Sequence, residues 1–174
     1  RLKPLTNYIP KPMVPFFFKP FLQYQIDLLR HHGIKDIIIS THYLPHVISN
    51  WFGDGSKWGV NIEYSHENEP LGTAGAVKKA EPLLRGCNNL IVLNGDILTD
   101  INIPDMMFWH FMRKAEISIA VKHVNDASPY GLVNLYSDYR VQDFTEKPDY
   151  PQPGFINAGI YIIDPKVIKR IPVD

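Results

Sequence analysis

The sequence has little of the features that most quickly assign a chain to a class. Its 174 residues include one cysteine, Cys87, which has no second cysteine to pair with. Because no intrachain disulfide can form, a disulfide-based fold is excluded. The 18 basic and 18 acidic residues give a formal net charge of zero, so no electrostatic argument favours nucleic acid or an acidic membrane as a partner. We therefore expect a cytoplasmic protein that binds neither nucleic acid nor membrane.

Long apolar runs and several catalytic patterns are also missing. The longest apolar runs, Met13 to Phe18 and Ile37 to Ile39, are far too short to cross a bilayer. No signal-peptide pattern opens the chain, and no serine or cysteine nucleophile motif occurs. The histidines show no metal-ligand spacing, and we interpret them as structural or exposed. They are His31, His32, His42, His46, His66, His110 and His123.

What the sequence does have is a regular alternation of helical and strand patterns. An apolar content of 45% with 21% charged residues is typical of one globular domain with a sizeable core. After a proline-rich opening over 1–19, which we expect to be an extended loop, a helix begins at Phe21 and ends at Gly33. Strands are then predicted over 36–41, 60–65, 89–93 and 117–123, and helices over 44–52, 73–84 and 103–114. This alternation predicts a parallel sheet with helices on both faces.

The pattern changes after residue 123. Three strand-like segments, 132–136, 141–146 and 155–163, follow with no helix between them, and Ser137-Asp138-Tyr139 indicates a hairpin between the first two. This half is predicted to be a mixed, partly antiparallel extension. Because we find no linker or internal repeat, we interpret residues 1–174 as one domain.

Two stretches point to a nucleotide site. Glu69 to Ala76 is a Pro/Gly turn that leads into a helical pattern, where backbone N–H groups are free to meet a ligand. The apolar strand Leu90 to Leu93 ends in Asn94-Gly95-Asp96, and in an open α/β sheet ligands bind beyond the carboxyl ends of the strands. One carboxylate with phosphate oxygens and water commonly holds Mg²⁺. Asp96 is therefore a candidate magnesium ligand, with a turn or N-cap aspartate as the alternative.

Four further positions offer groups to a phosphorylated ligand. Pro10 and Pro12 fix the backbone around Lys11, whose ammonium suits phosphate unless it is a solvated surface lysine. Glu146-Lys147-Pro148 ends a strand with an acceptor for sugar hydroxyls and a cation for phosphate. Asn157-Ala158-Gly159 and Tyr130-Gly131 combine polar groups with small residues that let a ligand approach. An exposed strand end or a simple bulge is the alternative for these last three.

In this order the motifs resemble those of the sugar-1-phosphate nucleotidyltransferases, or sugar-nucleotide pyrophosphorylases. Arg1-Leu2-Lys3-Pro4-Leu5-Thr6 is similar to the end of that family's glycine-rich signature, and the resemblance covers essentially the whole chain. The Pro-Leu-Gly-Thr-Ala-Gly form at 70–75 is most similar to mannose-1-phosphate guanylyltransferases. The resemblance implies a Rossmann-like three-layer α/β/α fold, with a mixed, mainly parallel central sheet and an antiparallel extension.

The resemblance also implies the chemistry. An oxygen of a sugar-1-phosphate attacks the α-phosphorus of a nucleoside triphosphate, and pyrophosphate leaves, with Mg²⁺ as cofactor. Arg1 and Lys11 would be catalytic and Asp96 the metal ligand. The implied nucleotide-binding residues are Glu67, Pro70, Gly72, Thr73, Gly95 and Asp96. The implied sugar-phosphate-binding residues are Tyr130, Gly131, Glu146, Lys147, Asn157 and Gly159.

Base choice allows an argument from hydrogen bonding. Counting back from Gly72 by the family register, Glu67 lies where the base edge is read. Guanine presents two adjacent donors there, and an ionised carboxylate accepts both. Uracil or thymine offers one donor flanked by acceptors, which suits Gln better. We therefore favour GTP with mannose-1-phosphate, giving GDP-mannose.

Other readings stay open. The nearest is the same reaction with glucose-1-phosphate and UTP, dTTP or ATP. Another is a non-catalytic, ligand-sensing regulatory paralogue, and a third is a doubly wound domain for some other phosphorylated ligand. By the resemblance, a glycine-rich loop precedes Arg1 and a second metal-binding aspartate follows Asp174, so we expect a domain truncated at both ends. Phe18 stands where relatives usually have Asn. We also expect a homo-oligomer.

Overall fold

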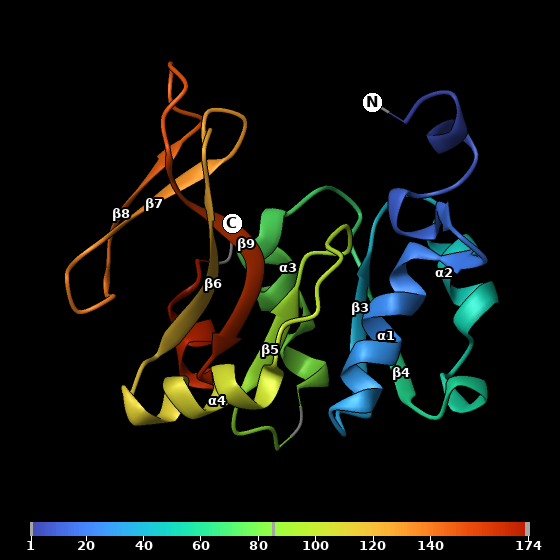
Figure 1. The fold of residues 1–174 in the computed structure, drawn as a ribbon. Coiled ribbons are helices and arrows are strands. Elements are labelled where there is room, and N and C mark those ends of the chain that lie inside the picture. The colour runs from blue at the N-terminus through green and yellow to red at the C-terminus, as the bar shows by residue number, and fades with distance from the viewer. Residues whose placement is uncertain (1, 85, 173–174) are drawn as a thin grey trace.

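A computed structural model describes residues 2–84 and 86–172 of the chain (Figure 1). These described residues form four helices and nine strands, with short 3₁₀ turns between them. The helices are α1 (Phe21–His31), α2 (Pro45–Phe52), α3 (Gly72–Ala80) and α4 (Ile103–Met112). The strands are β1 (Pro15–Phe16), β2 (Lys19–Pro20), β3 (Asp36–Thr41), β4 (Asn61–His66), β5 (Leu90–Leu93), β6 (Ile117–Val124), β7 (Gly131–Leu135), β8 (Val141–Glu146) and β9 (Gly154–Ile163).

From α1 onward, every element that the periodicity predicts is present within a few residues of its expected bounds. Gly33 follows α1 with a φ of 78°, the left-handed conformation that ends many helices. The helix predicted over 73–84 ends earlier, at Ala80, and continues as a 3₁₀ turn over Glu81–Leu83. Pro82 lacks the N–H that an α-helix would need there.

The opening segment departs from the predicted extended loop. It forms 3₁₀ turns at Leu5–Asn7 and Lys11–Met13 and then the short antiparallel hairpin β1–β2. Phe17, which has a φ of 53°, and Phe18 form the tip of this hairpin and lie on the surface. Arg1, the first catalytic candidate, lies outside the described residues.

The strands form two larger hydrogen-bonded groups. β3 and β4 pair in parallel, whereas β5, β6, β7, β8 and β9 form a 5-stranded sheet. Both β5 and β6 are antiparallel to β9, which lies between them, and the described strands show no pairing of β3 with β5. The α/β fold class is confirmed. The alternation predicted a parallel sheet, whereas among the described strands only β3 and β4 pair in parallel and every pair of the 5-stranded sheet is antiparallel. The last strand is central to this sheet and does not stand apart in an extension. The reason is its apolar end, since Ile160 and Ile162 are almost fully buried.

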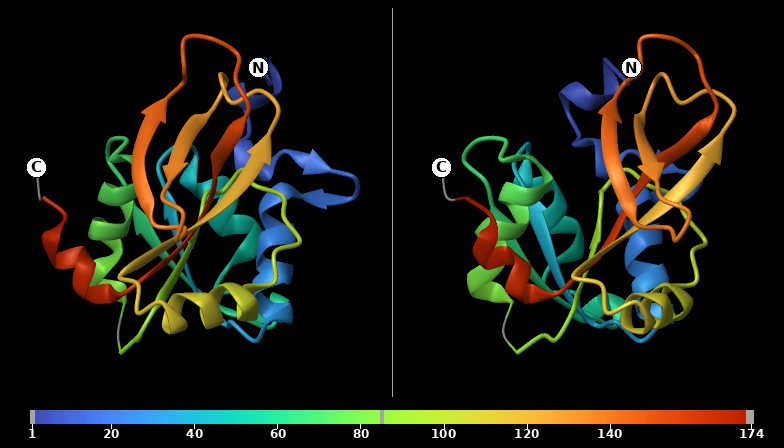
Figure 2. Two further views of the ribbon diagram at one scale, coloured as in Figure 1. Left: turned by 60° about the vertical axis from the view of Figure 1, so that its left-hand side comes forward. Right: turned by 90° about the vertical axis from the view of Figure 1, so that its left-hand side faces the viewer.

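Helices cover the sheet from two sides. Figure 2 shows α1 and α4 on one side of the strands, and α3 with the 3₁₀ turn Pro165–Arg170 on the other. The main apolar cluster joins α1, α2, β3 and β4, and a smaller one lies beneath β7. Within the part of the chain that the structure describes, no helix is both long and apolar enough to cross a membrane.

His110 is an example of a structural histidine. It is buried on α4, with Nδ1 2.9 Å from Oγ of Ser118. Burial lowers the pKa of the imidazole, and the carboxylate of Asp164 opposes this shift. The ring is therefore held toward its neutral form.

Candidate active site

The candidate residues are carried by loops at one side of the molecule. The strands β3, β4 and β5 run toward the upper side in Figure 1, and the segments that follow them turn there. The loops that lead into β7 and out of β8 lie on the same upper side, whereas the turn between these strands points away from it. This is the edge at which ligands bind in open α/β sheets, because the loops after successive strands meet there.

Lys11 and Asp96, the predicted phosphate and magnesium residues, are in contact. The ammonium Nζ of Lys11 donates to Oδ2 of Asp96 in an ion pair, although 85 positions separate the two residues. Their side chains remain 59% and 43% exposed, so both charges face solvent. The loops also lie against each other, because a Cβ added to Gly95 would be 3.3 Å from Cγ of Pro12.

The turn that carries Asp96 is fixed from two further elements. Gln25 of α1 donates from Nε2 to the carbonyl oxygens of Asn94 and Ile97, at 2.8 Å each. From β9, the carbonyl of Gly159 accepts from the N–H of Asn94 at 2.9 Å. Gly159 has a φ of +69°, and a Cβ there would lie 2.6 Å from Nδ2 of Asn94. A glycine is therefore needed at 159 for close packing against this turn.

Asn157, a predicted sugar ligand, is hydrogen-bonded within its own strand. Its Oδ1 accepts from the N–H of Gly159 at 2.8 Å, and its Nδ2 donates to the hydroxyl of Tyr161 at 2.7 Å. The contacts of Asn157 and Gly159 thus support the Asp96 turn from β9. A role toward a sugar stays a prediction.

Glu67, the predicted base-reading residue, also makes hydrogen bonds within the protein. Its side chain is buried, with 8% of the residue exposed, and Oε2 accepts from the N–H of Leu71 at 3.2 Å. Its backbone N–H donates to the carbonyl of Thr41 at 2.7 Å, and its carbonyl lies 3.0 Å from Nδ1 of His42. One carboxylate oxygen thus shapes the turn that leads to α3.

No side chain of the described residues caps the start of α3. Gly72 begins the helix with a φ of +69°, and Leu71 at the N-cap provides no side-chain hydrogen bond. Pro70, Gly72 and Thr73 are exposed. The first N–H groups of this helix can therefore reach a ligand.

The four sugar-phosphate candidates of the hairpin lie together. Gly131 pairs with Glu146 across β7 and β8, and the carbonyl of Tyr130 accepts from the N–H of Lys147 at 3.1 Å. The ammonium of Lys147 is 3.7 Å from Oε1 of Glu146, so the acid and the base share one side. Among the described residues, no hydrogen bond or ion pair links this group to Lys11 or Asp96.

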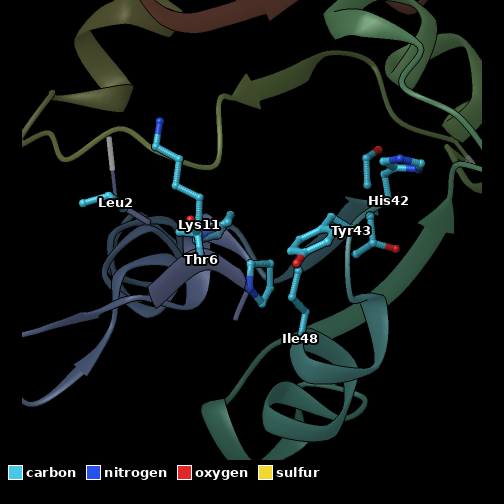
Figure 3. Close-up of a pocket in the computed structure, with 10 residues that line it drawn as sticks. Leu2, Thr6, Lys11, His42, Tyr43 and Ile48 are labelled. Atoms are coloured by element: carbon cyan, nitrogen blue, oxygen red, sulfur yellow. The ribbon is translucent and has the colours of Figure 1, made fainter. Parts of the chain in front are cut away.

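A pocket of about 790 Å³ lies between the N-terminal turns and the end of β3 (Figure 3). Lys11, one of the predicted site residues, borders this pocket. Its side chain extends toward the loop drawn above it in Figure 3. The opposite wall was not predicted, and it is formed by Ser40, Thr41, His42 and Tyr43. Ser40 and Thr41 end the predicted strand 36–41 and the other two follow it directly, which was the available signal. Tyr43 also donates its hydroxyl to the carbonyl of Asn7 at 2.9 Å, which ties the two walls together.

The donor set fits a metal ion that is shared with a ligand. Within residues 2–84 and 86–172, no group of three or more histidine, cysteine, aspartate or glutamate side chains could hold a metal by itself. Asp96 presents one solvent-facing carboxylate at a fixed turn. Mg²⁺ is commonly bound by one or two carboxylates together with substrate phosphates and water.

Comparisons with known proteins decide the family. The model of the nucleotidyl transferase family matches residues 1–173. The chain belongs to this family. It is 37% identical over 172 residues to a mannose-1-phosphate guanylyltransferase of Mycobacterium tuberculosis, which covers 99% of this chain and 48% of that protein. Mannose-1-phosphate guanylyltransferase 1 of Arabidopsis thaliana is 38% identical over 175 aligned positions, covering 98% and 48%. The chain thus spans about half the length of these relatives.

The fold of this nucleotidyl transferase family member agrees with that of a solved structure. HddC from Yersinia pseudotuberculosis, in its complex with GMP-PN, superposes with a TM-score of 0.85 and 31% sequence identity. The match covers 99% of this chain and 75% of HddC. The Rossmann-like fold that the motifs predicted is thereby confirmed.

Proposed function

We propose that residues 1–174 are part of a domain that transfers a nucleotidyl group from a nucleoside triphosphate to a sugar-1-phosphate. The observation that carries this proposal is the contact of Lys11 with Asp96, at the strand edge where the free N–H groups of α3 also lie. The arrangement presents a cation, a metal-binding carboxylate and backbone donors to a polyphosphate. Membership of the family supports the same reaction.

The chain's own groups would act by positioning and by neutralising charge. Lys11 exchanges its partner Asp96 for the α-phosphate when the nucleotide enters, and Arg1 neutralises the triphosphate. Glu146 orients the sugar hydroxyls and Lys147 holds the sugar phosphate for in-line attack. Asp96, once released by Lys11, would hold Mg²⁺, which supplies charge stabilisation on the phosphate oxygens.

We further propose GTP and mannose-1-phosphate as the substrates and GDP-mannose as the product. The relatives named for this activity support the pair. Glu67 supports the base choice, because one carboxylate oxygen is used by the N–H of Leu71 while the other accepts no hydrogen bond from the described residues. A guanine edge with two adjacent donors suits an acceptor-only group that is already oriented.

The direct test is pyrophosphate release by the full-length protein. Each of GTP, UTP, dTTP and ATP is offered with mannose-1-phosphate and with glucose-1-phosphate. We expect turnover to be fastest with GTP and mannose-1-phosphate. Turnover only with another pair would contradict the substrate choice, and binding of GDP-mannose without turnover of any pair would indicate the regulatory paralogue instead.

The Glu67→Gln variant tests the base-reading role separately. An amide replaces one acceptor oxygen by a donor, so the preference for GTP over UTP should fall about tenfold, the equivalent of losing one hydrogen bond. Glu63→Gln, at an exposed glutamate of β4, is the matched control. An unchanged GTP preference in Glu67→Gln would contradict this role.

The proposed protein is also a cytoplasmic homo-oligomer. Light scattering of the full-length protein measures its oligomeric state.

A further inference from the structure

One buried polar side chain outside the predicted site is connected directly to it. Gln25 lies on α1 and is 5% exposed. A glutamine amide has two N–H donors, and Nε2 reaches two acceptors, the carbonyl oxygens of Asn94 and Ile97, at 2.8 Å each. These carbonyls belong to residues on either side of Asp96. The amide therefore spans the turn that carries the candidate metal ligand.

The turn has little freedom to adopt another shape. The N–H of Ile97 donates to the carbonyl of Asn94 at 3.3 Å, which closes the turn on itself. Gly159 of β9 holds Asn94 from the opposite side, where no space remains for a Cβ. Buried, fully used hydrogen bonds of this kind favour one arrangement over its competitors. The Asp96 side chain faces solvent and Lys11.

We propose that Gln25 is a positioning residue for Asp96. Its amide sets the path of the backbone from Asn94 to Ile97 and so fixes the direction of the Asp96 carboxylate before a ligand binds. Groups that orient a metal ligand commonly change metal affinity or activity by about 10–100-fold when they are removed. The inference rests on the proposed function only in taking Asp96 as the carboxylate that meets the metal.

The test uses Gln25→Met in the full-length protein, which keeps the side-chain length and the helix preference but removes both donors. Gln23→Met is the matched control, because Gln23 lies on the same helix and its side chain makes no hydrogen bond to the residues that the structure describes. Mn²⁺ binding is measured by electron paramagnetic resonance, with Mn²⁺ alone and with Mn²⁺ plus GDP. Amide hydrogen exchange is followed over residues 93–98.

We expect Gln25→Met to weaken Mn²⁺ binding about tenfold and to speed exchange over 93–98, while Gln23→Met leaves both unchanged. In turnover, the Mg²⁺ concentration for half-maximal rate should rise by the same factor while the KM for the sugar phosphate stays constant. If Gln25→Met yields no soluble protein, Gln25→Leu, which also lacks the amide donors and introduces no charge, replaces it and should show the same losses.

Unchanged Mn²⁺ affinity in the Gln25 variant, or an equal loss in Gln23→Met, would overturn the inference. So would a wild-type protein that binds no Mn²⁺ under either condition. The outcome is separate from the proposed function. A wild type that transfers no nucleotide, but whose Mn²⁺ affinity still depends on Gln25, contradicts the proposed activity and supports the positioning role.

Discussion

The two sides of the candidate site are supported in very different ways. Asp96 lies on a turn that α1, β9 and the Lys11–Met13 segment all contact. Glu146 and Lys147 lie at the end of β8, a strand whose residues are all exposed. β7 joins that hairpin to β9 through only two paired positions, Leu132 with Ile156 and Val133 with Phe155.

The difference indicates that the two sides have separate roles. A metal and a triphosphate need groups fixed in advance, because a small misplacement removes much of their effect. In the proposed reaction the sugar-1-phosphate approaches from solvent and has to be released as part of a larger product. Segments with few buried contacts open at low cost in free energy. Leu132 and Val133 of β7 are buried and pair with β9, so the hairpin is the more weakly supported side only through its outer strand, β8.

The largest expected effect comes from the fixed side. Asp96→Asn keeps the size of the side chain but removes the charge that meets the metal. We expect kcat/KM to fall about 10³-fold, the equivalent of some 4 kcal/mol. Steady-state pyrophosphate release measures it. Asp100→Asn, an exposed aspartate four positions on, is the control and should keep near wild-type turnover. Comparable losses in both variants would contradict the assignment of Asp96.

A smaller and more selective effect is expected from the hairpin. Lys147→Met removes the ammonium but keeps the aliphatic stem. We expect the KM for the sugar-1-phosphate to rise about tenfold, as for the loss of one charge-assisted hydrogen bond, while the KM for the nucleoside triphosphate stays constant. Initial rates over both substrate concentrations separate the two constants. The exposed Lys122 on β6 gives the control Lys122→Met. An equal rise for the nucleotide would remove the distinction between the two sides.

The smallest effect is expected on stability. Phe144 on β8 is 54% exposed, so Phe144→Ala should change the free energy of unfolding by less than about 1 kcal/mol. Phe52, which is 2% exposed in the main apolar cluster, gives the same chemical change in a buried setting, and Phe52→Ala should cost about 3–5 kcal/mol. Urea denaturation followed by circular dichroism measures both. Similar losses for the two variants would show that the hairpin is not the weakly supported element described above.

Much of the fold was predictable because local signals were strong. The hairpin with its turn at 137–139 and the apolar strand Leu90–Leu93 are present where the turn residues and the periodicity predict them. The position of β9 was not predictable in the same way. Which neighbours a strand takes depends on contacts with distant segments, and periodicity reports only that the strand is buried.

The sequence could name candidate site residues one by one but could not show how they are connected. Lys11 and Asp96 were each expected to meet phosphate or metal, and the structure brings them together. Nothing in the local sequence marks Gln25, because a glutamine inside a helical run reads as an ordinary helix residue. Likewise, His42 and Tyr43 enter the pocket wall only because β3 ends beside the N-terminal turns.

The sequence by itself determined the kinds of chemistry available and the order of the elements that carry them. Local patterns can be identified without knowledge of the fold. Examples are a proline-flanked lysine, a strand ending in Gly-Asp and a Pro/Gly turn before a helix. Only the tertiary structure decided which side chains meet and which are rigid. Those outcomes depend on burial and on hydrogen bonds between segments far apart in the chain, such as Gln25 to the Asp96 turn.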